Sequence, residues 1–516
     1  MRVSCSRVLK VNALILIIAG VGLSSCINDE KQDMGHPNIV YILADDMGPG
    51  DVSSINMNAA WETPNIDRIA DEGIIFTDAH SGSAVCSPTR YGILTGRYSW
   101  RSKLKSGVLW SWDNELIEEN RLTVGSLLSN NGYETACIGK WHLGLGWQYQ
   151  EEFPDSIDFS KKILNGPVTR GFDYFYGITA SLDIPPYVYI ENDHVTSLPN
   201  RFTQNSSKFG WWRLGHTGSD FEHENVLPHL AQKAVDFIKR HKSKKDDKPF
   251  FLYFALPAPH TPILPTDEFK GKSGTNPYGD FVLQVDHTVE LVYKALEEYG
   301  YSDNTLFIFT SDNGCSPQAD FKELDEFGHN PSLVYRGHKA DIYEGGHRVP
   351  FVASWPGKIV PATSSDETIC LTDLVATCAE ILNIQLPDNA GEDSFSFLPA
   401  LYGESEILIR EATIHHSVNG SFAIRKGKWK LIMCPGSGGW SYPKPEIAKD
   451  LKLPPLQLYD LDSDIGETQN VAEKHPEIVD EMKELLKSYI VSGRSTQGEV
   501  QENAPSDNWP GLDWMN

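Results

Sequence analysis

From residue 38 onward, short apolar runs alternate with longer amphipathic stretches, and this alternation predicts an α/β fold. Residues 38–44 form a continuous apolar run of the kind found in strands buried on both faces. We expect further strands at 134–138, 250–256, 305–310 and 351–354, and helices at 63–72, 123–131, 225–241, 280–299 and 372–382. The pattern therefore predicts a large mixed β-sheet sandwiched by helices.

The pattern changes near residues 400–406, where longer elements give way to short apolar runs separated by turns. Strands are expected at 412–416, 421–425 and 429–433, with turns at Asn419-Gly420 and Lys426-Gly427. An apolar run at 456–461 and a helix at 476–489 follow. This predicts a domain at 37–402 and a smaller C-terminal subdomain at 403–516, an antiparallel sheet with one helix. The residues after Gly493 are expected to wrap the surface or fray.

The first 36 residues have the composition of an export signal and a tether. Three cations, Arg2, Arg7 and Lys10, precede an apolar run at 11–23 that is too short to span a bilayer comfortably. The run ends in Leu-Ser-Ser-Cys, which resembles a bacterial lipobox with Cys26 as the lipidated first residue. An ordinary secretory signal is the alternative. We expect a signal peptide at 1–25, a tether at 26–36, and an exported bacterial lipoprotein in the periplasm or on the outer-membrane surface.

Composition narrows the classes of partner. Apolar residues make up 40% of the chain, with 13 Trp, 20 Tyr and 22 Phe, which supports a substantial core. The net charge is −25, and loss of the signal peptide would make it more negative. Such acidity argues against nucleic-acid binding. An anionic ligand would need a locally cationic pocket.

The cysteines show no paired spacing. Cys5 would leave with the signal peptide, and Cys26 and Cys86 have other predicted fates. The remaining five are Cys137, Cys315, Cys370, Cys378 and Cys434. An odd set without a CxxC gives neither a disulfide framework nor a zinc site.

Oxygen-bearing side chains follow two of the expected strands. Asp45 and Asp46 come directly after the 38–44 run, and Asp312 and Asn313 follow the strand at 305–310. Open α/β sheets place their sites at these strand ends. Each pair alone is explained by a helix cap or an Asx turn. Two such pairs after buried strands favour a hard divalent cation, Ca²⁺ or Mg²⁺.

Cys86 is expected at the start of a helix. Pro88 suits the first turn of a helix, and Arg90 lies about one turn beyond Cys86. The backbone N–H groups at a helix N-terminus favour negative charge, so a bare cysteine there is typical of a low-pKa thiolate. A buried structural cysteine is the alternative.

Three further side chains are candidates for chemistry. Lys140 and His142 are two residues apart in an extended segment and are expected to face the same side. His260 is bracketed by prolines, which fix it in a rigid turn. A structural histidine bonded to backbone is the alternative for His260.

Three stretches together resemble the sulfatase family. Residues 86–96 match its signature Cys-x-Pro-x-Arg, an apolar pair and Thr-Gly; residues 132–142 resemble its second signature; residues 336–350 resemble its Gly-x-Lys and Glu-Gly-Gly-x-Arg-x-Pro segment. The resemblance covers most of residues 37–490 in the family's motif order. It implies the alkaline-phosphatase-like fold of that family and hydrolysis of sulfate esters.

The resemblance also implies a modification and a metal. In the family the signature cysteine is oxidised to formylglycine, an aldehyde whose hydrate is the nucleophile, so a maturation enzyme is an expected partner of Cys86. One calcium ion would be held by Asp45, Asp46, the converted Cys86, Asp312 and Asn313.

The catalytic roles carried over are distributed over five side chains. Arg90 and Lys140 would stabilise the hydrated aldehyde. His142 would assist release of enzyme-bound sulfate, and His260 would protonate the leaving alcohol. Lys339 would clamp sulfate oxygens. Fixed cations are what a transition state with charge spread over sulfate oxygens requires.

The substrate is expected to be a sulfated mono- or oligosaccharide. Candidate binding residues are Arg101, Lys105, Trp112, Asp183 and His338. Core packing of a tryptophan and turn capping by the aspartate are alternatives. The stretches most resemble the arylsulfatase and N-acetylgalactosamine-6-sulfatase branch, which implies exo-type removal of 6-O-sulfate from N-acetylgalactosamine or galactose. The functional alternatives are a phosphonate or phosphodiester hydrolase of the same superfamily and a non-catalytic surface glycan-binding lipoprotein.

Overall fold

A ten-stranded mixed sheet organises the computed structural model, which describes residues 35–152, 156–246, 248–404, 408–506 and 509–515. The strand order is β13-β2-β12-β11-β1-β10-β4-β5-β6-β7. The five central strands, β11 to β5 in this order, pair in parallel, and β12 and β6 pair antiparallel at either side. The mixed sheet of the predicted fold class is confirmed.

The strands of this sheet are β1 Asn38–Ala44, β2 Ile74–Phe76, β4 Glu134–Lys140, β5 Tyr174–Ile178, β6 Ile190–Glu191, β7 His194–Val195, β10 Phe250–Ala255, β11 Thr305–Ser311, β12 Phe351–Ser354 and β13 Thr363–Ser365. A parallel pair is formed by β3 Ala79–His80 and β14 Ile369–Cys370, and an antiparallel hairpin by β8 Pro199–Asn205 and β9 Trp212–Gly218. The predicted strands at 38–44 and 351–354 have these bounds, and the other three predicted strands differ by one or two residues at an end.

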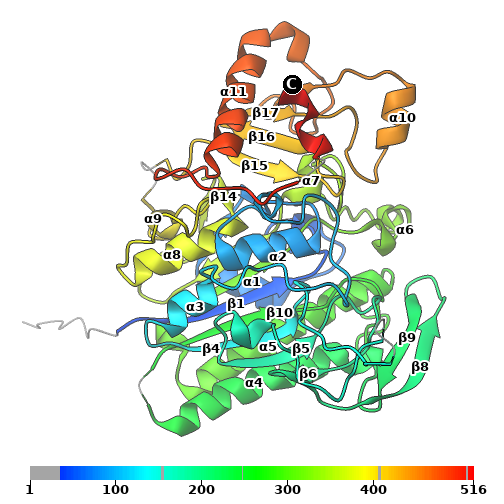
Figure 1. Ribbon diagram of the computed structural model, residues 1–516, viewed down its shortest axis with the longest axis vertical. Coiled ribbons are helices and arrows are strands. Elements are labelled where there is room, and N and C mark those ends of the chain that lie inside the picture. Colours follow the sequence, from blue (N-terminus) through cyan, green and yellow to red (C-terminus); the bar gives the residue numbers. More distant parts are fainter. Residues whose placement is uncertain (1–34, 153–155, 247, 405–407, 507–508, 516) are drawn as a thin grey trace, which may run out of the picture. The chain divides into compact units, whose positions relative to one another are not determined.

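Helices cover both faces of the sheet (Figure 1). The helices are α1 Pro64–Asp71, α2 Cys86–Thr95, α3 Val124–Ser129, α4 Val226–Lys244, α5 Pro277–Tyr299, α6 Phe321–Glu326, α7 Glu344–His347, α8 Leu374–Ile381, α9 Leu398–Leu401, α10 Pro445–Asp450 and α11 Pro476–Ser492. Alternate side chains of β1 divide between two cores. Ile39, Tyr41 and Leu43 pack with α2, α3 and α8. Val40, Ile42 and Ala44 pack with α1, α4 and α5.

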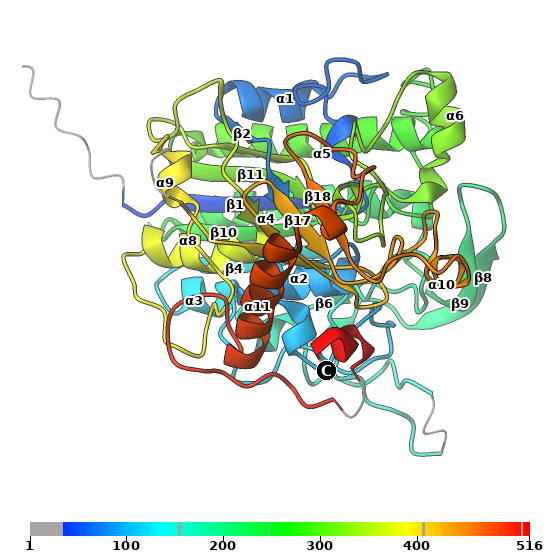
Figure 2. The ribbon, with the colours of Figure 1, turned by 90° about the horizontal axis from the view of Figure 1, so that it is seen from above.

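The C-terminal part forms a second sheet, as the sequence predicts. Its four antiparallel strands are β15 Thr413–His416, β16 Phe422–Lys426, β17 Trp429–Ile432 and β18 Gln457–Asp460. One face of this sheet packs with α11 and with Tyr98 and Trp100, which follow α2 (Figures 1 and 2). All ten residues of α2 are buried, and its apolar side chains pack in the core that also includes α3 and α8.

The chain beyond Gly493 wraps over the rest of the protein. Arg494 is buried, and the Ala504 amide donates to the Arg101 carbonyl at 2.6 Å. Residues 1–34, which contain the predicted signal peptide and most of the tether, lie outside the described residues. None of the helices in the described part of the chain is long and apolar enough to cross a membrane.

Candidate active site

Four neighbouring strand ends deliver polar side chains to one edge of the large sheet. Asp45 and Asp46 follow β1, Lys140 ends β4, and Asp312 follows β11. His260 follows β10 after a short turn. Since β4, β10, β1 and β11 are parallel neighbours, their carboxyl ends meet at this edge. The residues expected at strand ends are therefore brought together.

The direction of Lys140 depends on the glycine before it. Gly139 has φ +108°, and a Cβ there would lie 1.8 Å from the Ala255 carbonyl oxygen of β10. Only glycine adopts this conformation at such a close backbone approach without strain. The two strands can pair tightly up to the point at which Lys140 enters the site.

Asp45 lies between two cations and the cysteine. Its carboxylate is 2.6 Å from Lys140 Nζ and 3.7 Å from Arg90 Nη2. The Cys86 thiol donates to the same carboxylate at 3.6 Å. Arg90 also donates to Asp312 at 2.7 Å. Cys86 and Arg90 reach these partners because α2 begins at Cys86, as the sequence predicts, and points its N-terminus at the strand ends.

Asp46 collects a second set of partners. Its backbone is in the left-handed region at φ +68°, which aspartate tolerates better than most residues. Lys339 Nζ lies 2.7 Å from its carboxylate, and Asn313 Nδ2 donates to it at 2.7 Å. His260 Nε2 lies 3.6 Å away. Asp45, Asp46, Cys86 and His260 thus present ligand atoms within 4.8 Å of one another.

The pKa values of two buried carboxylates, Asp45 and Asp312, shift in opposite directions. Burial opposes ionisation of Asp45, but the cations of Lys140, Arg90 and Lys339 outweigh it and hold the pKa of Asp45 well below its ordinary value. Burial and the negative charge of Asp45 raise the pKa of Asp312 despite the nearby Arg90. Closely spaced carboxylates of this kind are relieved by a cation.

The donor set fits a hard cation. Asp45, Asp46 and Asp312 offer carboxylate oxygens, and Asn313 Oδ1 is buried without a hydrogen-bond partner. An amide oxygen left without a partner in a buried site is a cost that a metal ligand removes. All-oxygen donors suit Ca²⁺ or Mg²⁺ better than zinc.

Cys86 does not have the environment of a thiolate. Burial raises the pKa of its thiol to about 12, and the cations of Lys140 and Lys339 offset only part of this effect. The expectation of a low-pKa thiolate at the helix start is corrected by the complete burial of that helix. The unmodified thiol is a poor nucleophile at neutral pH.

His142 is held as a neutral base. Its Nε2 lies 2.9 Å from the Leu109 carbonyl oxygen, which accepts only, so Nε2 carries the proton. Burial and the cations of Lys140 and Arg90 keep the pKa of His142 well below its ordinary value. Its Nδ1 is buried without a hydrogen-bond partner and is free to accept a proton.

His260 is the partly accessible histidine of the site. Its side chain is 11% exposed, whereas the Asp45, Arg90 and Lys140 side chains are fully buried. Nδ1 faces the Thr261 carbonyl oxygen, which leaves Nε2 directed toward Asp46. His260 therefore lies at the border between the buried cations and solvent.

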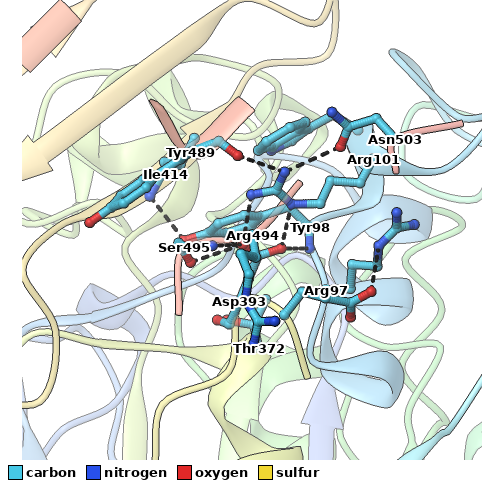
Figure 3. A network of polar contacts seen from close by, with 12 residues as sticks. Arg97, Tyr98, Arg101, Thr372, Asp393, Ile414, Tyr489, Arg494, Ser495 and Asn503 are labelled. Atoms are coloured by element: carbon cyan, nitrogen blue, oxygen red, sulfur yellow. Dashed lines mark hydrogen bonds and ion pairs between the residues drawn. The ribbon is translucent and has the colours of Figure 1, made fainter. Parts of the chain in front are cut away.

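Two of the expected substrate-binding cations serve the fold instead. Arg101 is buried and pairs with Asp393 at 2.8 Å, with Tyr489 and Asn503 as further partners (Figure 3). Lys105 donates to the Trp100 and Ala504 carbonyl oxygens. These contacts correct the expected substrate-binding role of both residues. Their side chains instead tie the C-terminal tail to the segment after α2.

The other three expected binding residues, Trp112, Asp183 and His338, differ in exposure and in their contacts. Trp112 is 45% exposed. Asp183 pairs with Arg213 at 2.5 Å, and its second carboxylate oxygen is buried without a partner. His338 Nδ1 lies 3.0 Å from the Lys339 carbonyl oxygen, so its side chain braces the loop that carries Lys339.

Sequence reasoning missed a buried histidine cluster formed by His80 of β3, His347 of α7 and His415 of β15. His347 and His415 stack with ring centroids 3.8 Å apart and planes at 5°. An ion binds in the plane of an imidazole ring, so rings stacked face to face cannot share one. Lys430 Nζ lies 3.0 Å from His347 Nε2, and His347 Nδ1 lies 3.0 Å from His80 Nδ1. The cluster is therefore a hydrogen-bonded network joining the β3–β14 pair and α7 to the C-terminal sheet, and its members are too far apart in sequence to give a local signal.

The described cysteines form no disulfide: Cys86, Cys137, Cys315, Cys370, Cys378 and Cys434 are all free and buried. This agrees with the absence of paired spacing in the sequence.

Comparison with known proteins identifies close relatives. A family model described as "Sulfatase" matches residues 37–384. The chain is 35% identical to N-acetylgalactosamine-6-O-sulfatase of Bacteroides thetaiotaomicron, over 93% of this chain and 99% of the relative. It is 31% identical to human arylsulfatase A over 87% of each chain. A solved structure from Bacteroides thetaiotaomicron, reported under the metabolism of multiple glycosaminoglycans, has a TM-score of 0.77 at 34% identity and covers 88% of this chain and 99% of its own.

Proposed function

We propose that this chain, which belongs to the sulfatase family, hydrolyses sulfate esters of carbohydrates at the site around Cys86, converted to formylglycine. The observation that carries the proposal is the position of Cys86 at the start of α2, with its Sγ 3.6 Å from Asp45 and with Arg90 and Lys140 contacting the same carboxylate. The family is one of hydrolases, and the side chains on which its chemistry depends are intact in this chain.

A calcium ion would be held by Asp45, Asp46 and Asp312 and by the unpartnered Oδ1 of Asn313. When both groups are in place, calcium supplies a fixed double charge for the sulfate oxygens, and the formylglycine hydrate supplies the attacking hydroxyl. A maturation enzyme is the partner that this modification requires.

The protein's own side chains supply the remaining charge stabilisation and the proton transfers. Lys140 and Lys339 hold positive charge beside the reacting group, and Arg90 holds Asp312 and the Lys140 carbonyl in place. His260 protonates the leaving alcohol through Nε2. His142, with Nε2–H fixed on Leu109, accepts a proton at Nδ1 during release of sulfate. The net reaction converts a sulfate ester and water into an alcohol, sulfate and a proton.

The proposed substrate is a 6-O-sulfated N-acetylgalactosamine or galactose at the end of a glycan. Support comes from the relative named N-acetylgalactosamine-6-O-sulfatase, which the chain matches over 93% of its length. A phosphonate or phosphodiester hydrolase and a non-catalytic glycan-binding lipoprotein are the competing activities, and both are outcomes of the experiment below.

We also place the protein outside the cytoplasm, as a lipoprotein anchored through Cys26 in the periplasm or on the outer-membrane surface. The support is the lipobox-like end of the apolar run at 11–23. Membrane fractionation of wild type and Cys26→Ala tests this placement: the variant should move from the membrane to the soluble fraction, and an unchanged distribution would contradict it.

The deciding experiment measures sulfate release from a panel of defined sulfated sugars by protein co-expressed with a maturation enzyme. Mass spectrometry should find the aldehyde at position 86, and Cys86→Ala should abolish turnover. Cys434→Ala, another buried free cysteine, is the matched control and should retain it. Faster hydrolysis of paired phosphate esters, glycan binding without turnover, or an active protein with an unmodified Cys86 thiol would each overturn the proposal.

A further inference from the structure

An aromatic cleft lies between the segment at Trp112 and the β8–β9 hairpin. Its volume is about 930 Å³, and its lining includes Trp112, Tyr149, Phe159, Phe202, Leu214 and His216. None of the described residues that line it is Asp, Glu, Lys or Arg. The cleft is thus a surface for an uncharged ligand, in contrast to the cationic site around Cys86. Its outer wall is the β8–β9 hairpin, which carries Phe202 and Leu214, 61% and 60% exposed.

One loop joins this cleft to the catalytic side chains. The Leu109 amide donates to Ser87 Oγ, next to Cys86, and the Leu109 carbonyl faces His142 Nε2. Trp112 follows three residues later, so its backbone lies within about 10 Å of that of Leu109 even in a fully extended chain. A chain-like ligand reacting at Cys86 therefore reaches the cleft with its next units.

The tryptophans at this junction form a flat, fixed surface. Trp110 and Trp112 stack with centroids 5.1 Å apart and planes at 8°. The guanidinium of Arg213 lies over Trp110, 5.2 Å from its ring centroid, and is itself held by Asp183. Two large aromatic side chains, 39% and 45% exposed on a braced loop, are unusual unless something binds them.

From these observations we infer that the cleft binds the sugar units adjoining the sulfated one, and that these units carry no carboxylate or sulfate. The apolar C–H face of a hexose or N-acetylhexosamine packs on an aromatic ring, and its hydroxyls remain free for polar contacts. An anionic sugar in the same place would lose hydration without meeting a cation among the described residues that line the cleft, since Arg213 is turned onto Trp110 and paired with Asp183. This inference rests on the proposed function and narrows its substrate to glycans in which the sulfated residue is followed by neutral sugars.

The first test compares substrates of different length on the mature enzyme. Trp112→Ala should lower the ratio of kcat/KM for a neutral 6-O-sulfated oligosaccharide to kcat/KM for 4-nitrophenyl sulfate by about tenfold, mostly through KM. Tyr402→Ala removes an aromatic side chain of similar exposure from α9's C-terminus and should leave the ratio unchanged. An unchanged ratio in Trp112→Ala would overturn the inference.

The second test measures the preference of the cleft for neutral over anionic sugar units. Wild type should turn over the neutral oligosaccharide with a lower KM than one with the same sulfated sugar followed by a uronate. Phe202→Lys places a cation in the cleft at an exposed position and should narrow this difference. Equal KM values for the two substrates in wild type, or no response to Phe202→Lys, would contradict the neutral-sugar assignment. Failure of the proposed function is seen separately, as absence of turnover with every sulfate ester, 4-nitrophenyl sulfate included.

Discussion

At the scale of single residues, the two site histidines differ in burial and in which ring nitrogen is left free by a backbone carbonyl. His142 is buried and neutral, and its Nε2–H donates to the Leu109 carbonyl oxygen, so a further proton can bind only at Nδ1. His260 is partly exposed and directs Nε2 toward Asp46 and the site. The proposed roles use this difference: His142 would be a base inside the site, and His260 an acid at the entrance through which the alcohol leaves.

The assignment of His260 as the acid predicts a dependence on the leaving group. His260→Ala should lower kcat for sugar sulfates, which have poor alkoxide leaving groups, by about a hundred- to ten-thousand-fold, and should affect aryl sulfates much less. Rates on both substrate types measure this. His287→Gln, on the partly exposed face of α5, serves as the control. Equal losses on the two substrates would remove His260 from the role of acid.

The unpartnered amide oxygen of Asn313 predicts a metal effect that does not depend on turnover. Calcium should raise the Tm of the wild-type protein, because an ion that binds only the folded state stabilises it. Asn313→Leu should lose most of this increase, while Asp267→Asn, at a carboxylate that is 95% exposed, should keep it. Calorimetry with and without chelator is the measurement. A calcium-independent Tm in the wild-type protein would sink the calcium assignment.

Sequence predicts the members of the site better than their partners. Asp45 and Asp312 were expected because they follow apolar runs, and parallel strands bring such residues together. The roles of Arg101 and Lys105 were misjudged, since their proximity to Cys86 in sequence does not reveal that the tail covers them. The state of the Cys86 thiol was misjudged because α2 is completely buried, partly by α8, which lies far later in the chain.

At the scale of elements, long apolar runs were the reliable signal. The run at 38–44 became β1 with every residue buried, since a strand covered on both faces has no polar alternation. The hairpin β8–β9 was not expected, because β8 alternates between intermediate and exposed positions and the buried residues of β9 are glycines and a threonine rather than an apolar run. Elements that lie outside the core leave a weak hydrophobic pattern in the sequence.

The buried histidine cluster joins β3 and α7 to β15 of the C-terminal sheet and predicts sensitivity to acid. Burial lowers the pKa of His80, His347 and His415. Asp78 lies 2.8 Å from His80, and Glu344 lies 3.7 Å from His347. Both carboxylates are already paired with the fixed cations of Arg348, Arg425 and Lys430, so an added proton meets no unpaired negative charge there. Because unfolded histidine titrates near pH 6.5, the stabilisation is complete above that pH. It is lost as the pH falls, by up to about 1.4 kcal/mol per pH unit for each histidine.

A single substitution isolates this contribution. His415→Asn keeps a donor for the Ser81 carbonyl but removes the titrating ring. The excess stability of the wild type over the variant should shrink by about 2 kcal/mol between pH 7.5 and pH 5, measured by urea unfolding. Burial raises the pKa of Glu467 to about 7, which acts in the opposite direction, but it is common to both proteins. The exposed His194→Asn should give a curve parallel to wild type, and a parallel curve for His415→Asn would refute the prediction.

At the scale of the whole molecule, the C-terminal tail is part of the support for the catalytic helix. Asp393 accepts from the Tyr98 amide, from Arg101 and from Ser495, so one carboxylate joins the segment after α2 to the tail (Figure 3). Tyr489 at the end of α11 and Asn503 complete the contacts of Arg101. The segment that leaves the catalytic helix is thereby fixed by residues far along the chain.

This junction predicts a loss of stability without a loss of chemistry. Arg101→Met leaves the buried Asp393 carboxylate without its cation and should lower the free energy of unfolding by about 3–5 kcal/mol, measured by urea denaturation. The double variant Arg101→Met/Asp393→Asn removes the stranded charge and should recover part of that loss. Lys426→Met, which breaks a partly exposed pair with Glu411, should cost no more than about 1 kcal/mol. Below their unfolding transitions all three variants should keep the kcat and KM of the wild type on a sugar sulfate. A raised KM with unchanged stability in Arg101→Met would contradict this prediction. It would mean that Arg101 binds substrate, although its contacts with Asp393 and Tyr489 argue against that role.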